Sequence, residues 1–449
     1  MDKINSPIPL SQRDANFLPL LWLWASGNVL LASFLVGSYY AFDLGVAGTI
    51  WISITANAFA YIICALSCQK SARYGLDEVV ALRPTFGMKG ASIGGIIIFL
   101  ITCGWVGILS SMTGSAATMI MSDHLGVAGF SGDYGVYALS IGIVIPLLLI
   151  AIKPSVGFKL FSVAAPIMIL FALYMLWRIL TTNRVELGGI EQGASLFGAS
   201  LAIELCFAYA IAWLPYLGAW SRFATSERSA YWAAFLGLAV VGTLFAIVGG
   251  LATLITGELD PVVWSTQLGL GISSLMIVIL GTITSVALLV YSASSAIVSI
   301  TRNISFRMAC LIVAVPSSVL VFSTSLQDLF DFIMLFVGLI VGTYWAVAMC
   351  DYFLVRQQHI DVAACYDENG PYRYRNGWHP QAFVAMAAGC VVWLFLGGWM
   401  SGAGWISFTL GETLFSYLTA SLPAMLVSAG VYLLLARHQH ARVPQASRT

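Results

Sequence analysis

Residues 202–223 read AIELCFAYAIAWLPYLGAWSRF, an apolar stretch long enough to cross a lipid bilayer that nevertheless contains Glu204, Pro215 and Gly218. A proline removes a backbone donor and a glycine weakens the helix, so we expect this span to break partway across the membrane. Free backbone groups at that depth are tolerated only beside protein or a water-filled cavity. The stretch therefore predicts a binding site inside the membrane.

A second interrupted span lies near the N-terminus, where residues 24–28 read WASGN and Gly37 follows. Interrupted hydrophobic segments in corresponding halves of a chain are typical of secondary transporters, whose substrate and ion sites lie at unwound helices near the bilayer midplane. The two stretches together indicate transport of a small molecule.

The composition places the whole chain in the bilayer. Of its 449 residues, 59% are hydrophobic and only 9% are charged, whereas about a quarter of the residues in soluble domains are charged. Twelve apolar runs have the length needed to cross about 30 Å of hydrocarbon. We expect the spans at residues 17–42, 48–67, 91–119, 136–152, 161–176, 196–220, 231–255, 272–300, 308–322, 329–350, 380–400 and 413–436.

The basic residues predict the orientation. With both termini in the cytoplasm, all but Arg178 and Arg184 of the twenty Lys and Arg residues face the cytoplasm, as the positive-inside bias requires. No cleavable signal peptide is visible. We therefore expect a multi-pass protein of the plasma or inner membrane. The basic residues lie in short membrane-flanking loops and form no nucleic-acid patch, and no obligate protein partner is indicated.

The sequence contains little that could support catalysis. It has no Gly-rich phosphate loop and no Ser nucleophile elbow, and its five histidines lie in expected loops or the tail. The cysteines form no Cys-x-x-Cys pair, so we expect neither structural zinc nor disulfides. Nothing resembles the filter loop of a channel. The chain is therefore interpreted as a non-enzymatic membrane protein.

Several loop motifs carry a family resemblance. Residues 83–90, RPTFGMKG, and 104–107, GWVG, are similar to the Arg-x-Ser-Phe-Gly-x-Lys-Gly and Gly-Trp-Phe-Gly signatures of the nucleobase:cation symporter-1 family. Residues 220–223, WSRF, resemble the end of its Pro-Asp-Phe-Thr-Arg-Phe motif, and the segment 351–380 matches a further family pattern. Cytosine, hydantoin, allantoin and uracil permeases belong to this family.

The resemblance implies an all-α membrane protein of twelve transmembrane helices built from two inverted five-helix repeats, a LeuT-like fold with broken spans 1 and 6. The substrate would lie between these two spans and spans 3 and 8. The expected division is a cytoplasmic tail 1–16, a first repeat 17–180, a second repeat 195–350, a cytoplasmic loop 351–379, spans 11 and 12 in 380–436, and a cytoplasmic tail 437–449.

The resemblance also implies a sodium ion where span 1 unwinds against span 8. The matching positions are Ser26 and Val29, through their carbonyls, and Gly281, Thr284 and Ser285 on span 8. Sodium is a hard cation that prefers oxygen ligands, and a broken helix end supplies free carbonyls and a negative dipole. The alternative is that both hydroxyls bond only to their own helix.

Trp105 aligns with the family tryptophan that stacks on the planar substrate, and stacking contributes about 0.5–1.5 kcal/mol beyond area burial. Its alternative role is packing. The chain departs from the family in span 6, where Ala210 replaces an aromatic residue between Tyr209 and Trp213. In span 8, Val286 replaces an amide, while Thr102 is the polar residue near the tryptophan. Fewer amides weaken the assignment to a nucleobase but leave transport intact.

Glu204 lies within an apolar span, where an ionisable group costs about 2.5–3.5 kcal/mol on insertion scales. It could bind a cationic substrate, carry a coupled proton, or pair with a polar group for structure alone. The sequence thus favours a sodium-coupled symporter that imports a small planar nitrogen heterocycle by alternating access. The alternatives are a proton-coupled importer of a vitamin-like or cationic metabolite that uses Glu204, or a non-transporting receptor or channel.

Overall fold

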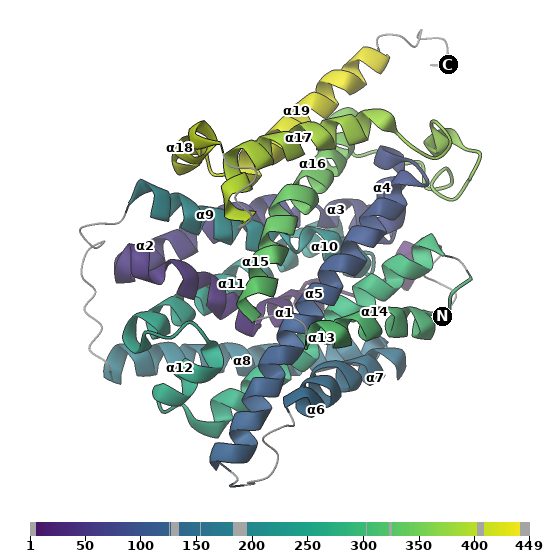
Figure 1. Ribbon diagram of the computed structural model, residues 1–449. Coiled ribbons are helices and arrows are strands. Elements are labelled where there is room, and N and C mark those ends of the chain that lie inside the picture. Colours follow the sequence, from purple (N-terminus) through teal and green to yellow (C-terminus); the bar gives the residue numbers. More distant parts are fainter. Residues whose placement is uncertain are drawn as a thin grey trace.

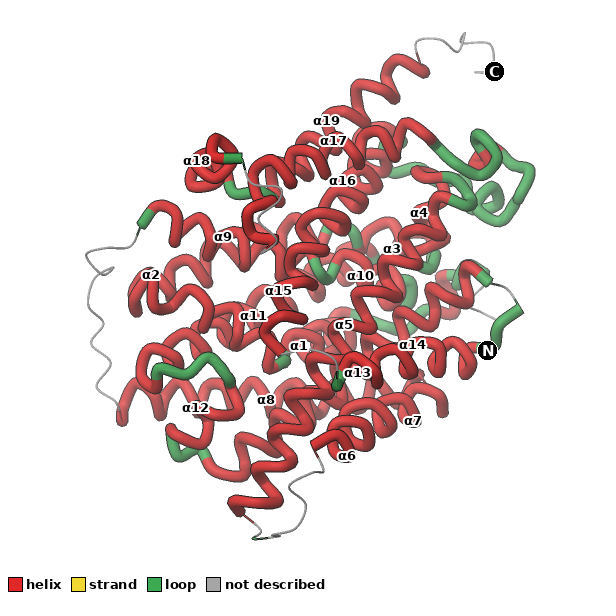
Figure 2. The backbone as a smooth tube through the Cα atoms, viewed as in Figure 1, coloured by secondary structure: helices red, strands yellow, loops and turns green. Residues whose placement is uncertain are grey.

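The computed structural model describes residues 6–124, 126, 134–152, 154–182, 195–301, 303–322, 326–401 and 408–440. Within these ranges the chain is mostly helical and forms no β-strand beyond isolated bridges (Figure 2). The expected all-α fold is therefore confirmed. Residues 1–5 and 441–449 of the two expected tails lie outside the described residues, and so does Arg184.

The N-terminal part of the chain forms the first eight helices of the bundle (Figure 1). They are α1 (Phe17–Asn28), α2 (Leu31–Ala65), α3 (Cys68–Tyr74), α4 (Glu78–Phe86), α5 (Gly90–Met119), α6 (Tyr134–Leu139), α7 (Ile145–Ile152) and α8 (Pro154–Thr182). A π-helical turn, Ser140–Val144, joins α6 to α7, so these two helices form one continuous apolar segment.

The C-terminal part follows with two groups of helices. They are α9 (Leu196–Ile211), α10 (Leu214–Ser221), α11 (Glu227–Thr256), α12 (Pro261–Gln267), α13 (Gly271–Ile300), α14 (Phe306–Leu320), α15 (Leu326–Phe336) and α16 (Thr343–Cys350), then α17 (Pro380–Gly397), α18 (Thr409–Leu418) and α19 (Ser421–His440). The π-helical turn Val337–Gly342 joins α15 to α16. Helices α17 and α19 pack together on one side of the bundle (Figure 1).

Helix α2 includes parts of two expected spans, residues 17–42 and 48–67. Gly45, at φ 62° and ψ −171°, interrupts its helical geometry. A positive φ is accessible to glycine without a steric penalty. The chain reverses direction here, because the hydroxyl of Tyr40 lies 2.7 Å from Oγ of Ser53, whereas thirteen residues of straight helix would separate them by about 20 Å. The turn expected between residues 42 and 48 is therefore present as a tight reversal at Gly45, and the helical segments on either side of it lie antiparallel.

Eight helices among the described residues are long and apolar enough to cross a membrane. Helices α18 and α19, bent by 93°, pass this test together, and Tyr134–Ile150 and Phe306–Leu320 are shorter apolar helices. Helix α8 presents Val163, Leu170 and Trp177, seven residues apart and each more than half exposed, as an outward apolar stripe. Such a stripe suits contact with lipid. The exact count of twelve spans remains a prediction.

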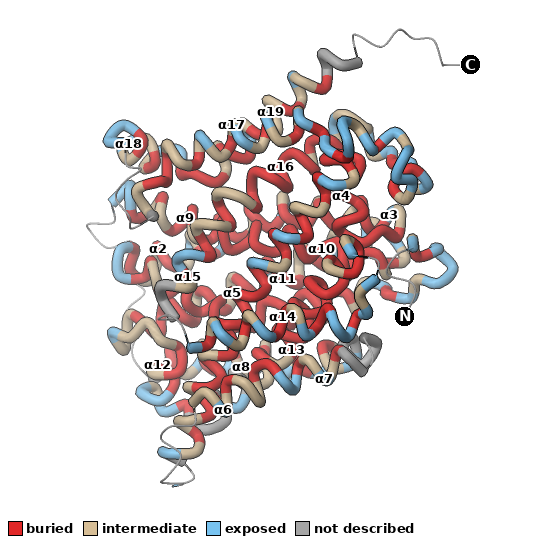
Figure 3. Tube along the Cα trace, turned by 45° about the vertical axis from the view of Figure 1, so that its right-hand side comes forward, coloured by how far each residue is buried: buried red, intermediate tan, exposed pale blue. Residues whose placement is uncertain are grey.

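The centre of the bundle is formed by helices from both halves of the chain. Helix α5 runs the length of the molecule and packs against α13, while α2 packs along α11 (Figure 1). Buried residues concentrate in the interior of the bundle, whereas exposed residues lie in loops, at helix ends and along outward faces of the peripheral helices (Figure 3). This arrangement brings the ends of α1 and α9 to the buried centre, where α5 and α13 face them.

Candidate functional site

The first interrupted segment separates α1 from α2. Helix α1 ends at Asn28, Val29 has ψ 66°, and Leu30 is extended. The last carbonyls of a helix have no partner within the helix and carry its negative dipole end. The break thus presents backbone oxygens inside the protein, where they require a hydrogen-bond donor or a cation.

All five positions expected to bind the cation lie together at this break. The Oγ of Ser285 donates to the carbonyl of Ser26 at 3.0 Å, which joins α13 to α1. The Oγ1 of Thr284 donates to the carbonyl of Gly281 at 2.9 Å, within its own helix. A Cβ on Gly281 would come within 2.7 Å of the carbonyl oxygen of Val29, so only glycine allows this close approach.

This set combines backbone carbonyl and hydroxyl oxygens, and it contains no carboxylate. Oxygen donors of this kind suit a hard cation of low charge, such as sodium. The alternative, in which the hydroxyls bond only to their own helix, describes one residue of the pair. Thr284 bonds to its own helix, whereas Ser285 bonds across to α1. The set of oxygen atoms therefore fits the expected ion, to which Ser26 and Val29 would offer their carbonyls and the two residues of α13 their hydroxyls.

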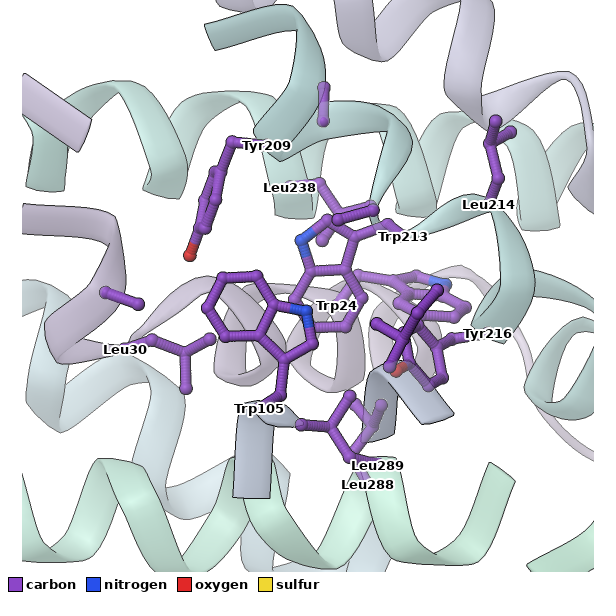
Figure 4. Packing of buried hydrophobic residues seen from close by; sticks show 14 of the residues in the cluster. Trp24, Leu30, Trp105, Tyr209, Trp213, Leu214, Tyr216, Leu238, Leu288 and Leu289 are labelled. Carbon is purple, nitrogen blue, oxygen red and sulfur yellow. The ribbon is translucent and has the colours of Figure 1, made fainter. Parts of the chain in front are cut away.

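The second interrupted segment separates α9 from α10. Helix α9 ends at Ile211, and α10 begins at Leu214 with Pro215 in its first turn, where a proline needs no amide partner. The break turns a set of large side chains toward α1, α5 and α13, where they enclose a small cleft (Figure 4). The lining residues are Leu30, Trp105, Tyr209, Ala212, Trp213, Tyr216 and Leu289.

Trp105 is the central side chain of this aromatic cleft (Figure 4). Its ring lies edge-to-face with Tyr209 and with Phe330, at centroid distances of 6.0 Å in both cases. Trp213 lies on the other side of the cleft, edge-to-face with Tyr216 at 5.9 Å. The space left between the side chains holds about one water molecule. A planar ligand therefore requires these rings to separate.

Hydrogen bonds connect the aromatic cleft to the two breaks. The indole Nε1 of Trp213 donates to Oδ1 of Asn28 at 2.9 Å, at the last residue of α1. The hydroxyls of Tyr209 and Ser33 lie 2.6 Å apart. The Oγ1 of Thr102 lies 3.0 Å from the hydroxyl of Tyr216. Thr102 thus reaches the cleft through Tyr216 rather than lining it.

The structure gathers only some of the residues expected to bind substrate. Trp105, Tyr209 and Trp213 line the cleft, but Ala210 and Val286 do not. Both are fully buried. Leu289, three residues after Val286, is the residue of α13 that reaches the cleft. The rotation of α13 about its axis decides between these two positions, and a sequence alignment does not determine that rotation.

Glu204 lies away from the cleft and binds the N-terminus of α19. Its Oε2 accepts from the backbone N–H of Ala420 at 3.0 Å, and both carboxylate oxygens accept from that of Ser421, at 3.0 and 3.1 Å. The hydroxyl of Ser421 also donates to Oε1. A carboxylate at a helix N-terminus satisfies otherwise unpaired N–H groups and the positive dipole end. Of the roles left open for Glu204, the geometry matches the structural one.

Leu30, Tyr216, Leu289 and Asn28 belong to the site but were not among the expected site residues. Two of them had a detectable signal. Tyr216 follows the helix-breaking Pro215, and Asn28 is the only side-chain amide in α1. Leu30 and Leu289 are ordinary apolar residues in apolar segments, so only the three-dimensional arrangement identifies them.

Comparison with known proteins places the chain among membrane permeases. The family model described as a permease for cytosine/purines, uracil, thiamine and allantoin matches residues 7–418. The purine-uracil permease NCS1 of Arabidopsis thaliana is 26% identical over 86% of this chain and 69% of its own length. The allantoin permease of Bacillus subtilis is 24% identical, covering 86% and 85% of the two chains.

A solved structure shares the fold over almost the whole chain. Mhp1, a nucleobase-cation-symport-1 family transporter in a closed conformation with bromovinylhydantoin bound, superimposes with a TM-score of 0.79. The match covers 98% of this chain and 96% of that one at 19% identity. An inward-facing conformation of Mhp1 gives a TM-score of 0.76. These values confirm the expected fold class.

The family model covers most of the chain, the curated relatives are permeases, and the helices are long and apolar. The chain is therefore a multi-pass membrane transporter and not an enzyme. It belongs to the family of permeases for cytosine/purines, uracil, thiamine and allantoin, the nucleobase:cation symporter-1 family.

Proposed function

We propose that this protein imports a small planar nitrogen heterocycle together with sodium by alternating access. One observation carries the proposal: the segment between α1 and α2 takes part in both candidate sites. The carbonyl of Val29 lies against Gly281 at the ion position, and the next residue, Leu30, lines the aromatic cleft. A single unwound segment can thus link binding of the ion to binding of the substrate.

The character of the cleft favours a planar ligand. Trp105, Tyr209, Trp213 and Tyr216 present aromatic faces and edges that suit a heterocyclic ring. Polar contacts would come from the hydroxyls of Tyr209 and Tyr216, since the amide of Asn28 is occupied by Trp213, Tyr61 and Leu238. The named substrates of the relatives, which include allantoin and a hydantoin, agree with a small ring. A hydroxyl-lined site can both donate and accept hydrogen bonds.

Alternating access requires a closed path on one side of the site, and buried ion pairs provide it. Asp77, the N-cap of α4, lies 3.5 Å from Arg222 just after α10 and accepts from Ser299 of α13 at 3.0 Å. Lys70 and Glu78 form a second buried pair, at 2.6 Å. The first pair fastens the end of α10 to α4 and α13, and the second joins α3 to α4, both on the side expected to face the cytoplasm. We infer that they separate when the site opens inward.

In this mechanism, α1, α2 and α9 to α11 form a bundle that moves against a scaffold of α5, α6, α7, α13 and α14. The ion site lies between α1 of the bundle and α13 of the scaffold. The substrate cleft also has walls from both groups. The movement that closes the protein around the ion and the substrate is then the same movement that opens the site toward the opposite side of the membrane. This shared movement couples the transport of the two ligands.

The decisive experiment measures substrate uptake into proteoliposomes as a function of external sodium. A double variant, Thr284→Ala with Ser285→Ala, removes both hydroxyls and should raise the sodium concentration for half-maximal uptake by about tenfold or more, equivalent to about 1.4 kcal/mol. Ser294→Ala is the matched control, because that buried hydroxyl of α13 contacts Cys310 in α14 and not the break. It should leave the sodium response unchanged.

An equal sodium response in the wild type and the double variant would remove the ion-site assignment. Uptake that follows the proton gradient and ignores sodium would replace sodium with a proton as the coupled ion. Thermal-shift measurements against nucleobases, hydantoins, allantoin, vitamins and amines, with and without sodium, identify the substrate, because a ligand of the native state raises its stability by mass action.

A further inference from the structure

A polar cavity of about 540 Å³ lies where α5 begins and α13 ends, far from the aromatic cleft. Its volume is within the range of small-molecule sites. Trp105 is fifteen residues along α5 from Gly90, so the two sites are separated by about 22 Å along the helix. The loop between α16 and α17 covers the cavity with Glu368, Asn369 and Arg373.

Basic side chains predominate in the cavity wall. Arg83 forms its buried base, with Nη1 donating to the carbonyl of Cys365 at 2.8 Å and Nη2 to that of Ser299 at 3.1 Å. Lys89 and Arg373 are exposed at the rim. Glu368 is the acidic side chain of the lining, so the described charges give an excess of positive charge.

The two basic side chains at the rim, Lys89 and Arg373, are available to bind an anion. Arg373 donates from Nη1 to the neutral amide oxygen of Asn369 at 2.7 Å. The aliphatic stem of Lys89 lies against Gly377, which positions its ammonium group. Within the described part of the chain, neither side chain has a carboxylate within 4.0 Å. An anion in the cavity would therefore meet two cations that form no ion pair with a described carboxylate, although Glu368 also lines the cavity.

The depth of the cavity defines the kind of anion. Gly90 starts one candidate membrane span and Ile300 ends another, and both spans border the cavity. The cavity thus lies at the level where apolar helix surface gives way to the lipid headgroups. Basic pockets at this level, on the side rich in Lys and Arg, suit anionic headgroups. The N-terminal dipole of the thirty-residue helix α5 adds positive potential.

We propose that this cavity binds a phosphate group, held between Lys89 and Arg373 over Arg83. Its depth makes the phosphodiester of an anionic lipid the favoured source, and inorganic phosphate shares the same chemistry. A bound phosphate joins the loop between α16 and α17 to the ends of α5 and α13. The inference is independent of the transported substrate and of the coupling ion.

The test compares the purified protein in two kinds of nanodisc, one of phosphatidylcholine alone and one that also contains phosphatidylglycerol. A third sample is the protein in detergent with inorganic phosphate. Melting temperature and lipid retention in native mass spectrometry are the readouts. The variants are Lys89→Gln with Arg373→Gln, and each substitution alone. Arg375→Gln is the matched control, because Arg375 is exposed in the same loop but does not line the cavity.

In the wild type, phosphatidylglycerol should raise the melting temperature and be retained. The double variant should bind it about tenfold more weakly or worse, since each basic residue near the headgroups contributes substantially. The single variants should show intermediate losses, and Arg375→Gln should behave as the wild type. If the wild type responds to inorganic phosphate but not to phosphatidylglycerol, and the double variant loses that response, the phosphate site is supported with inorganic phosphate as its ligand. No response in the wild type, or equal responses in every variant, overturns the proposal.

Discussion

Replacing Glu204 tests whether its carboxylate is structural. The side chain is 3% exposed and accepts from three groups at the start of α19: the N–H of Ala420, and the N–H and hydroxyl of Ser421. A hydrogen bond to a charged group contributes about 1.5–3 kcal/mol, and the interaction of a carboxylate with a helix dipole about 0.3–2 kcal/mol. Glutamine keeps one accepting oxygen but turns an NH₂ group toward these donors.

We expect Glu204→Gln to lower the free energy of unfolding by about 2–5 kcal/mol, which is one charge-assisted bond plus the dipole interaction. Ser421→Ala removes a single donor and should cost about 1–2 kcal/mol. Glu204→Ala, which leaves all three donors without an acceptor, should be the most severe. Melting temperature in detergent, measured with the yield of monodisperse protein, ranks the series.

The same variants are then assayed for transport. A structural carboxylate predicts that the folded fraction of Glu204→Gln retains wild-type substrate affinity and an unchanged pH profile of uptake. The reasoning is refuted if Glu204→Gln is as stable as the wild type, or if its uptake shifts with pH while its stability is preserved. Either result would return Glu204 to the cation or proton pathway.

Three further outcomes follow from the site and its surroundings. Trp105→Ala should weaken substrate binding by about tenfold or more. Trp105→Phe should retain part of the affinity, because the smaller ring keeps an aromatic face. Unchanged affinity in the alanine variant would exclude stacking. Asp77→Asn removes the carboxylate beside Arg222, and breaking a buried ion pair costs about 3–5 kcal/mol. Maleimide should therefore label the buried Cys68 faster in this variant than in the wild type. Equal labelling rates would argue against a closing contact. Burial lowers the pKa of His379 below its ordinary 6.5, so the folded state disfavours its protonation and stability should fall as the pH drops below about 6.5. His379→Gln should reduce this acid sensitivity in thermal melts, and identical pH–stability curves would contradict it.

The features that the sequence predicts well have local physical causes. Pro215 interrupts its span because it lacks an amide hydrogen, and the helices indeed end and restart beside it. Ser285 and Thr284 are neighbours in the sequence, so a correct alignment at one position places both. The composition alone assigns the chain to the bilayer.

The features that the sequence misses depend on distant partners or on the rotation of a helix. The cost of burying Glu204 is visible in the sequence, but its partner Ser421 lies 217 residues away along the chain. The choice between Val286 and Leu289 depends on how α13 packs against α1 and α5.

The single peptide that joins Val29 to Leu30 has a thermodynamic consequence. Whatever factor the ion adds to the affinity for the substrate, the substrate must add to the affinity for the ion, because coupling free energies are reciprocal. With one residue at the proposed ion position and the next in the cleft, no flexible linker lies between them to absorb a displacement. A substitution that loosens this peptide should therefore weaken cooperativity between the two ligands before it weakens the binding of either one alone.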